Sequence, residues 1–146
     1  AVGKAIYAKQ HRRNYRHYVI LGDAECGEGS VWESVMAAAH YKLDNLIAFV
    51  DNNGLQIDGN IIDVMSPAPI GEKFKAFGWF VQEIDGHDFQ AIEEALKRAK
   101  ANKGCPSVIV AHTVKGKGVS FMENQASWHG SAPSAEQVVV ALNELK

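Results

Sequence analysis

The amino-acid sequence predicts an α/β domain with a mainly parallel β-sheet flanked by helices. Four short apolar runs, typical of strands buried on both faces, alternate with segments of helical pattern. Turn-forming residues follow the first two runs, Gly22 and Asp23 after one and residues 51–54 after the next. Strands and helices that alternate in this way form parallel sheets with right-handed crossovers. The 146 residues are enough for one such domain, 1–146, with a sizeable core.

The first helix is expected over residues 2–10, because Val2, Ile6 and Tyr7 are spaced as one helical face. A continuous apolar run over residues 18–21 predicts the first strand. Between them, the charged stretch HRRNYRH favours a solvated turn over a functional basic patch.

The second helix is expected over residues 30–42, where Ser30 and Glu33 have the spacing of a capping box. Its apolar side chains lie on nearly all sides, which predicts a buried helix, for example in a subunit interface. The second strand is expected over residues 45–50, and the turn residues 51–54 follow it.

The second half continues the alternation. Gly78 ends a short helix expected over residues 70–77, because glycine is the usual residue just past a helix. Strands are expected over residues 79–84 and 107–114, on either side of an amphipathic helix over 88–101. The apolar face of that helix consists of Phe89, Ile92, Ala95, Leu96 and Ala99.

A long irregular segment over residues 115–134 precedes a last helix expected over 135–145. Loops of this length in a compact domain are usually functional. Ligands of parallel sheets bind outside the carboxyl ends of the strands. Asp23, Asn53 and the loop after Val114 all lie at such ends, so we expect the functional site there.

Composition narrows the function classes. The net charge of −2 gives no indication of binding to nucleic acid or an anionic membrane, and no apolar run approaches the roughly 20 residues of a membrane span. Cys26 and Cys105 form no C-x-x-C motif and are expected to be reduced thiols of a cytoplasmic protein. The chain opens within a helical pattern, without Met or a capping residue, so we expect it to be the C-terminal part of a longer domain.

The pattern around Asp23 suits a hard divalent cation that holds a phosphate. Asp23 and Asn53 lie thirty positions apart, about one βαβ unit, and would place two oxygen ligands at adjacent strand ends. Other fingerprints are missing: the glycines at 27 and 29 lack the third glycine of a dinucleotide turn, and no P-loop, G-x-S-x-G or H-E-x-x-H motif occurs.

The remaining pattern, G-D followed by N-N after the next strand, resembles the thiamine diphosphate motif of transketolases and their relatives. The likeness covers essentially the whole chain, in order and spacing. The chain is similar above all to the N-terminal subunit of two-subunit transketolases. The segments that carry it are GDAECGEGSVWE, HYKLDNLIAFVDNNGLQIDG, AFGWFVQEIDGHD, VKGKGVSFMEN and SWHGSAPS.

The resemblance implies a fold, the pyrophosphate-binding domain of these enzymes, and a cofactor site. Asp23 and Asn53 would hold Mg²⁺, or Ca²⁺ or Mn²⁺ in its place, by their side chains, and Leu55 by its backbone carbonyl. The backbone N–H of Ala24 and the side chain of Asn53 would contact the diphosphate of thiamine diphosphate. The family usually has glycine at position 24, and if that position needs a positive φ, alanine costs on the order of 1 kcal/mol.

Three further roles follow from the resemblance. Lys115 would lie near the cofactor. His129 would lie between the diphosphate and the donor sugar, as a cofactor-binding and catalytic residue. Glu28 would be buried near the two-fold interface and couple paired sites. The family's upstream histidines, its pyrimidine-binding glycines and its cofactor-activating glutamate have no counterpart in these residues.

The implied activity is transfer of a two-carbon ketol unit between sugar phosphates in pentose phosphate metabolism. The implied partners are a second copy of the assembled pair and, within each pair, a C-terminal transketolase subunit. Two alternatives stay open: another thiamine diphosphate enzyme, such as a deoxyxylulose-phosphate synthase or a 2-oxoacid dehydrogenase component, or a non-catalytic assembly domain.

Overall fold

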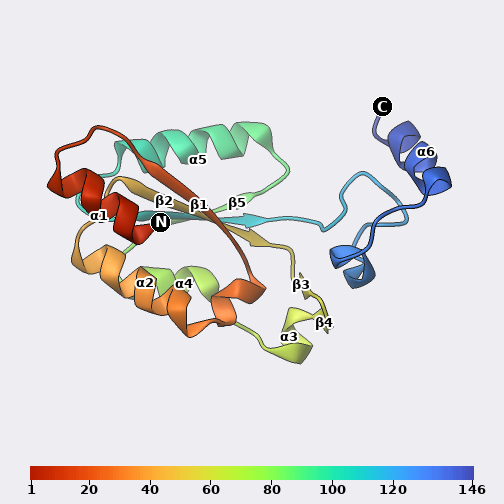
Figure 1. Ribbon diagram of the computed structural model, residues 1–146, viewed down its shortest axis with the longest axis horizontal. Helices are drawn as coiled ribbons and strands as arrows, with labels where there is room; N and C mark the ends of the chain where they lie inside the picture. The colour runs from red at the N-terminus through yellow and green to blue at the C-terminus, as the bar shows by residue number, and fades with distance from the viewer.

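The computed structural model describes all residues, 1–146. Its centre is a four-stranded sheet in the order β1-β2-β6-β5, with every neighbouring pair parallel (Figure 1). The predicted parallel α/β sheet is therefore confirmed. The strands are β1 (His17–Gly22), β2 (Leu46–Asn52), β5 (Phe80–Asp85) and β6 (Ser107–His112).

Helices cover both faces of this sheet, as Figure 1 shows. On one face lie α1 (Val2–Gln10), α2 (Gly29–His40) and α4 (Ile70–Ala76), and on the other lies α5 (Phe89–Ala101). The alternation of side chains along each strand divides the apolar core into two clusters. Leu46, Ala48 and Val50 of β2 face the first cluster, with Val35 and Phe74, whereas Ile47 belongs to the second, with Ala95 and Ala99.

The connections explain this placement. The chain passes from β1 through α2 to the adjacent β2, crosses to β5 at the far edge, and returns through α5 to β6 in between. Because crossovers are right-handed, the reversal of direction places α5 on the opposite face from α2 and α4. All four strands end at the same edge of the sheet, and β1 and β2 end side by side.

Smaller elements surround that carboxyl edge. A 3₁₀ turn, η1 (Ala24–Gly27), follows β1, and a hairpin of β3 (Leu55–Gln56) and β4 (Gly59–Asn60) follows β2, ahead of α3 (Ile61–Val64). The predicted turn at Asp58 and Gly59 falls at the tip of this hairpin, where Asp58 lies in the loop and Gly59 begins β4. Within the long irregular segment, only η2 (Ala126–His129) is helical, and α6 (Ala135–Glu144) stands away from the sheet (Figure 1).

The predicted capping box at the start of α2 is wrong. The helix begins at Gly29 with Glu28 as N-cap, and no side chain caps it. Glu28 already ends η1, so the chain enters α2 directly from that turn, and Ser30 falls inside the first helical turn instead of before it. A capping box does occur at α6, where Ser134 and Gln137 bond to each other's backbone N–H groups.

Two other predictions need correction. Phe89 does not join the buried face of α5 but is 87 % exposed, because it is the first residue of the helix. The last strand ends at His112 and not at Val114. The helix ending at Gly78 is confirmed, with the φ of Gly78 at +87°. Both cysteines are free, as predicted, and none of the helices has the length and apolar character needed to cross a bilayer.

Candidate functional site

Backbone register brings the two predicted ligand segments together at the carboxyl edge. Gly22, the last residue of β1, pairs with Asp51 of β2, and the N–H of Asp23 donates to the Asp51 carbonyl at 3.1 Å. Asp23 therefore lies directly beside the turn that contains Asn53 and Gly54. The left-handed φ of Gly54, +73°, turns its N–H back toward Asp23.

The Asp23 carboxylate is buried without a cationic side chain beside it. It is 2 % exposed, and its two oxygens accept from backbone groups: Oδ1 from the Ala24 N–H at 2.8 Å and Oδ2 from the Gly54 N–H at 2.6 Å. Burial raises the pKa of Asp23 above its ordinary value; the N–H donors of Gly54 and Ala24 oppose the rise, and the nearby charge of Asp51 adds to it. A bound cation would relieve this unfavourable environment.

The side chain of Asn53 is oriented by hydrogen bonds within its own turn. Its amide nitrogen donates to Asp51 Oδ2 at 3.3 Å, and its oxygen accepts from the Leu55 N–H at 3.0 Å. Thr113, which follows β6, donates its hydroxyl to the other oxygen of Asp51. Asp51 therefore links the segments that follow β1, β2 and β6, through its hydrogen bonds to Asp23, Asn53 and Thr113.

A cavity of about 510 Å³ opens at this edge. The structure places every residue predicted for the site on its wall, although those residues come from four separate segments of the chain. The predicted residues are Asp23, Ala24, Glu28, Asn53, Leu55, Lys115 and His129. The other lining residues are Gly22, Glu25, Asp51, Gln56, Ile57 and Asp58.

Lys115 and His129 meet at the mouth of this cavity, with 3.3 Å between Lys115 Nζ and His129 Nδ1. The loop that carries them is held in a compact turn. The Asn124 N–H donates to the Lys115 carbonyl at 2.9 Å, and Gly116, with φ +74°, passes so close to Met122 that a Cβ would lie 2.6 Å from its carbonyl oxygen. The irregular segment is thus an ordered wall of the site.

The electrostatics favour a cation. Five carboxylates line the cavity, and Lys115 is its one Lys or Arg side chain. No group of three or more His, Cys, Asp or Glu side chains converges on one point as a metal site. A cation here would be held by the mixed oxygen set of the prediction: the Asp23 carboxylate, the Asn53 amide and the Leu55 carbonyl. Hard cations such as Mg²⁺ accept such sets.

Two residues differ from expectation. Ala24 has no positive φ, so the strain considered for alanine at that position does not arise, and its N–H donates to Asp23 instead of pointing free into the cavity. Asp51 is predicted by the sequence only as a turn residue, yet it orients Asn53 and lines the site. Its position at the end of a strand, two residues before Asn53, is the signal that could have identified it.

Comparison with known proteins identifies the family. The sequence profile described as "Transketolase, thiamine diphosphate binding domain" matches residues 4–145. A subunit of the apulose-4-phosphate transketolase of Phocaeicola vulgatus is 43 % identical over 144 residues, which are 99 % of this chain and 51 % of that protein. The 6-deoxy-6-sulfo-D-fructose transketolase subunit SqwG of a Clostridium species is 41 % identical over 146 residues, covering 100 % of this chain and 53 % of that protein.

Solved structures give the same result. The transketolase of Campylobacter jejuni superposes with a TM-score of 0.91 at 30 % identity, over 98 % of this chain and 23 % of that one. The transketolase of Leishmania mexicana superposes with a TM-score of 0.90 at 29 % identity, over 99 % and 23 %. The chain spans about half the length of the curated relatives it matches. With the profile matching almost every residue, the chain belongs to the transketolase family, as a thiamine diphosphate-binding domain.

Proposed function

We propose that this chain is part of a transketolase subunit that binds thiamine diphosphate with Mg²⁺ and transfers a two-carbon ketol unit from a ketose to an aldose. The observation that carries the proposal is the cavity at the carboxyl edge, whose wall is shared by the residues that the resemblance assigns to the site, from four segments of the chain. Asp23, Asn53, Lys115 and His129 are far apart in the sequence, and it is the fold that brings them together.

The residues present fit the cofactor's diphosphate end. Asp23, Asn53 and the Leu55 carbonyl would hold the cation, and the buried, unpaired carboxylate of Asp23 fits that role because a cation supplies its missing counter-charge. Lys115, which lies beside His129 at the mouth of the cavity, would neutralise diphosphate charge. When bound, thiamine diphosphate supplies the carbanion chemistry of ketol transfer.

His129 is the residue we assign to the substrate. It is exposed at the cavity mouth, and Nδ1 faces Lys115, so the Nε2 side of the ring is free to hydrogen-bond a hydroxyl of the donor sugar or to move a proton there. The relatives' names mention a sugar phosphate and a sulfo-sugar. We therefore propose ketoses with a terminal phosphate or sulfonate as the substrate class.

The proposed assembly has two parts. Several similar proteins are named as single subunits of a transketolase, and the single-chain transketolases extend far beyond the matched region. We propose that the chain binds a C-terminal partner subunit and that two such assemblies pair through a surface that includes Glu28. We also propose a cytoplasmic location and a place in pentose phosphate metabolism.

The decisive experiment is Asp23→Ala in the chain assembled with its partner subunit. We expect Mg²⁺-dependent binding of thiamine diphosphate, measured by isothermal titration calorimetry, to be lost, because Asp23 is the only carboxylate of the cation set. Asp58→Ala is the matched control: it removes a carboxylate from the same cavity but outside the set, and should leave binding within a few-fold. Unchanged affinity in Asp23→Ala would refute the assigned site. A ketol-transfer assay run beside pyruvate turnover separates transketolase from the pyruvate-using relatives.

A further inference from the structure

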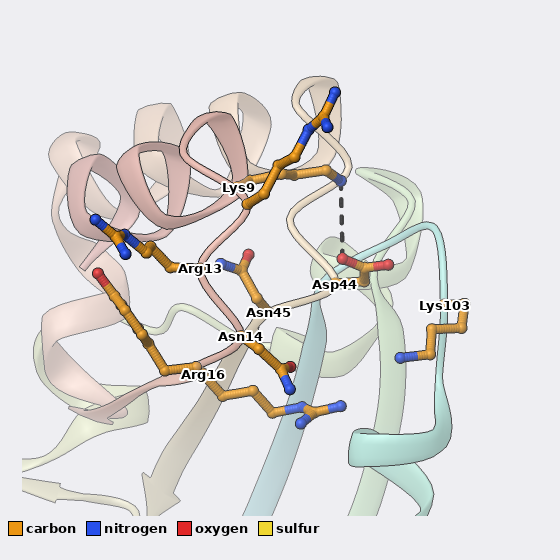
Figure 2. Close-up of a pocket in the computed structure, with 9 residues that line it drawn as sticks. Lys9, Arg13, Asn14, Arg16, Asp44, Asn45 and Lys103 are labelled. Carbon is orange, nitrogen blue, oxygen red and sulfur yellow. Dashed lines mark ion pairs between the residues drawn. The ribbon is translucent and has the colours of Figure 1, made fainter.

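A second pocket lies at the opposite edge of the sheet, where the strands begin. Its volume is about 320 Å³, and nine residues line it. They come from the end of α1 and the segment that follows it, from the turn before β2 and from the turn between α5 and β6. Lys9, Arg12, Arg13, Arg16 and Lys103 provide five cationic side chains, against one carboxylate, Asp44 (Figure 2). We call this the basic pocket.

Most of the positive charge in the basic pocket is not neutralised by the protein. Asp44 is already engaged, because Lys9 Nζ lies 3.7 Å from its Oδ1 and the Gly104 N–H donates to its Oδ2 at 3.1 Å (Figure 2). Arg12, Arg13 and Lys103 form no ion pair, although the chain as a whole carries a net charge of −2. Five of the fifteen Lys and Arg side chains of the chain therefore line this one pocket.

The guanidinium of Arg16 has spare donors. Nη2 donates to the Lys100 carbonyl at 2.9 Å, whereas the buried Nε has no hydrogen-bond partner. In Figure 2 the charged ends of Arg16 and Lys103 point toward one another. Two like charges held this way repel, and an anion between them would remove the repulsion.

Basic residues at this edge have a simpler explanation that accounts for only part of the set. The helices α1, α2 and α5 end here, and cations stabilise the carbonyl end of a helix within its last turn. Lys9 fits that explanation. Arg16 fits it too, because it donates to the Lys100 carbonyl in the last turn of α5. Arg13 does not, because it lies three residues beyond Gln10, the end of α1.

From this geometry we infer that the basic pocket binds a small, multiply charged anion that carries phosphate groups. Arginine guanidinium groups match phosphate oxygens in pairs. The pocket is near the lower end of small-ligand volumes, and Tyr15 is its only hydrophobic lining residue, so it suits a compact polar molecule and not one with a large apolar part. Because it faces the amino ends of the strands, roughly 20 Å from the cavity at their carboxyl ends, its ligand does not compete there.

The test uses inorganic pyrophosphate as the probe, in buffer of low salt with EDTA. Without a metal, the carboxylate-lined cavity repels this anion, so the basic pocket is the site measured. We expect one-to-one binding by calorimetry, weakened by added salt, and amide chemical-shift changes in residues 12–16 and 103 but not at Asp23 or His129.

Variants make the test specific. The double variant Arg12→Ala with Arg13→Ala should weaken binding at least tenfold, whereas Lys4→Ala, an exposed lysine of α1 outside the pocket, should not change it. Circular dichroism checks that the variants are folded. Absence of binding, equal binding in the double variant, or shifts confined to the catalytic cavity would each overturn the inference. Binding of heparin or duplex DNA without binding of pyrophosphate would also overturn it, in favour of a macromolecular partner.

Discussion

Asp51 shows how one side chain can set the geometry of a site without binding the ligand itself. Its carboxylate accepts a hydrogen bond from the amide nitrogen of Asn53. This bond orients the amide, so that its oxygen is the end left for other partners. We predict that Asp51→Asn weakens Mn²⁺ binding, measured by calorimetry with thiamine diphosphate present, by about 10–100-fold, as for other residues that orient a metal ligand. Asp58→Asn removes the same charge from the same cavity and should have a smaller effect. Equal effects would mean that Asp51 acts only through its charge.

Cys26 gives a second residue-scale prediction, this one dependent on pH. Burial, with the charges of Asp23 and Glu25, raises the pKa of its thiol to about 11, from an ordinary value of 9.0. At pH 8 we expect Ellman's reagent to modify Cys105 in the native chain and both cysteines only after denaturation.

The same shift has a consequence for stability. The thiol is neutral in both states below pH 9, so its contribution to stability is fully present there; as pH rises from 9 to about 11, the unfolded chain loses its proton first and the contribution is lost. Urea denaturation of the wild type and Cys26→Ala should therefore differ in pH dependence above pH 9. For the Ellman's-reagent experiment, modification of both cysteines in the native chain at pH 8 would contradict the prediction that the buried Cys26 thiol is unreactive.

At the scale of elements, the body of the sheet could be predicted from the sequence, because it depends on local pattern. The apolar runs of β1, β2, β5 and β6 and the amphipathic pattern of α5 are visible in any short window. The start of α2 could not be predicted in the same way, because a neighbouring turn supplies Glu28 as N-cap. The hairpin of β3 and β4 is visible in the sequence only as a turn, because strands of two residues leave no periodic signal.

Two phenylalanines in helices differ in how deeply their side chains are buried, and we expect their contributions to stability to differ accordingly. Phe74 of α4 is 0 % exposed, with its ring centroid 5.4 Å from that of Trp32 and 5.1 Å from that of Trp79. We predict that Phe74→Ala lowers the free energy of unfolding by about 3–5 kcal/mol, because it leaves a cavity in the larger core cluster. Phe89→Ala, at a residue that is 87 % exposed, should change it by no more than about 0.5 kcal/mol. Urea denaturation of both variants measures the difference, and similar losses would mean that Phe89 has a packing role hidden in the single chain.

At the scale of the whole molecule, the candidate site joins parts of unequal local stability. β2 and β6 form the buried centre, whereas α6 has no buried residue. Its Glu144 carboxylate accepts hydrogen bonds from the N–H of Ser120 at 2.6 Å and from the Ser120 hydroxyl at 2.7 Å. The residues of the site could be identified from the sequence because their spacing carries a family resemblance. Their convergence could not, because it depends on strand order and on the folding of residues 115–130 across the sheet edge.

This unequal attachment predicts an order of amide hydrogen exchange. In the native chain, amides of β2 and β6 should exchange most slowly, and those of α6 roughly tenfold or more faster than those of α5, since α5 buries Ala95 and Ala99 against the sheet. Glu144→Ala removes both bonds to Ser120 and should accelerate exchange in α6 and around Ser120 while leaving α5 unchanged. Mass spectrometry of peptides from the two helices provides the measurement. Exchange in α6 as slow as in α5 would show that α6 packs more firmly than its exposed surface indicates.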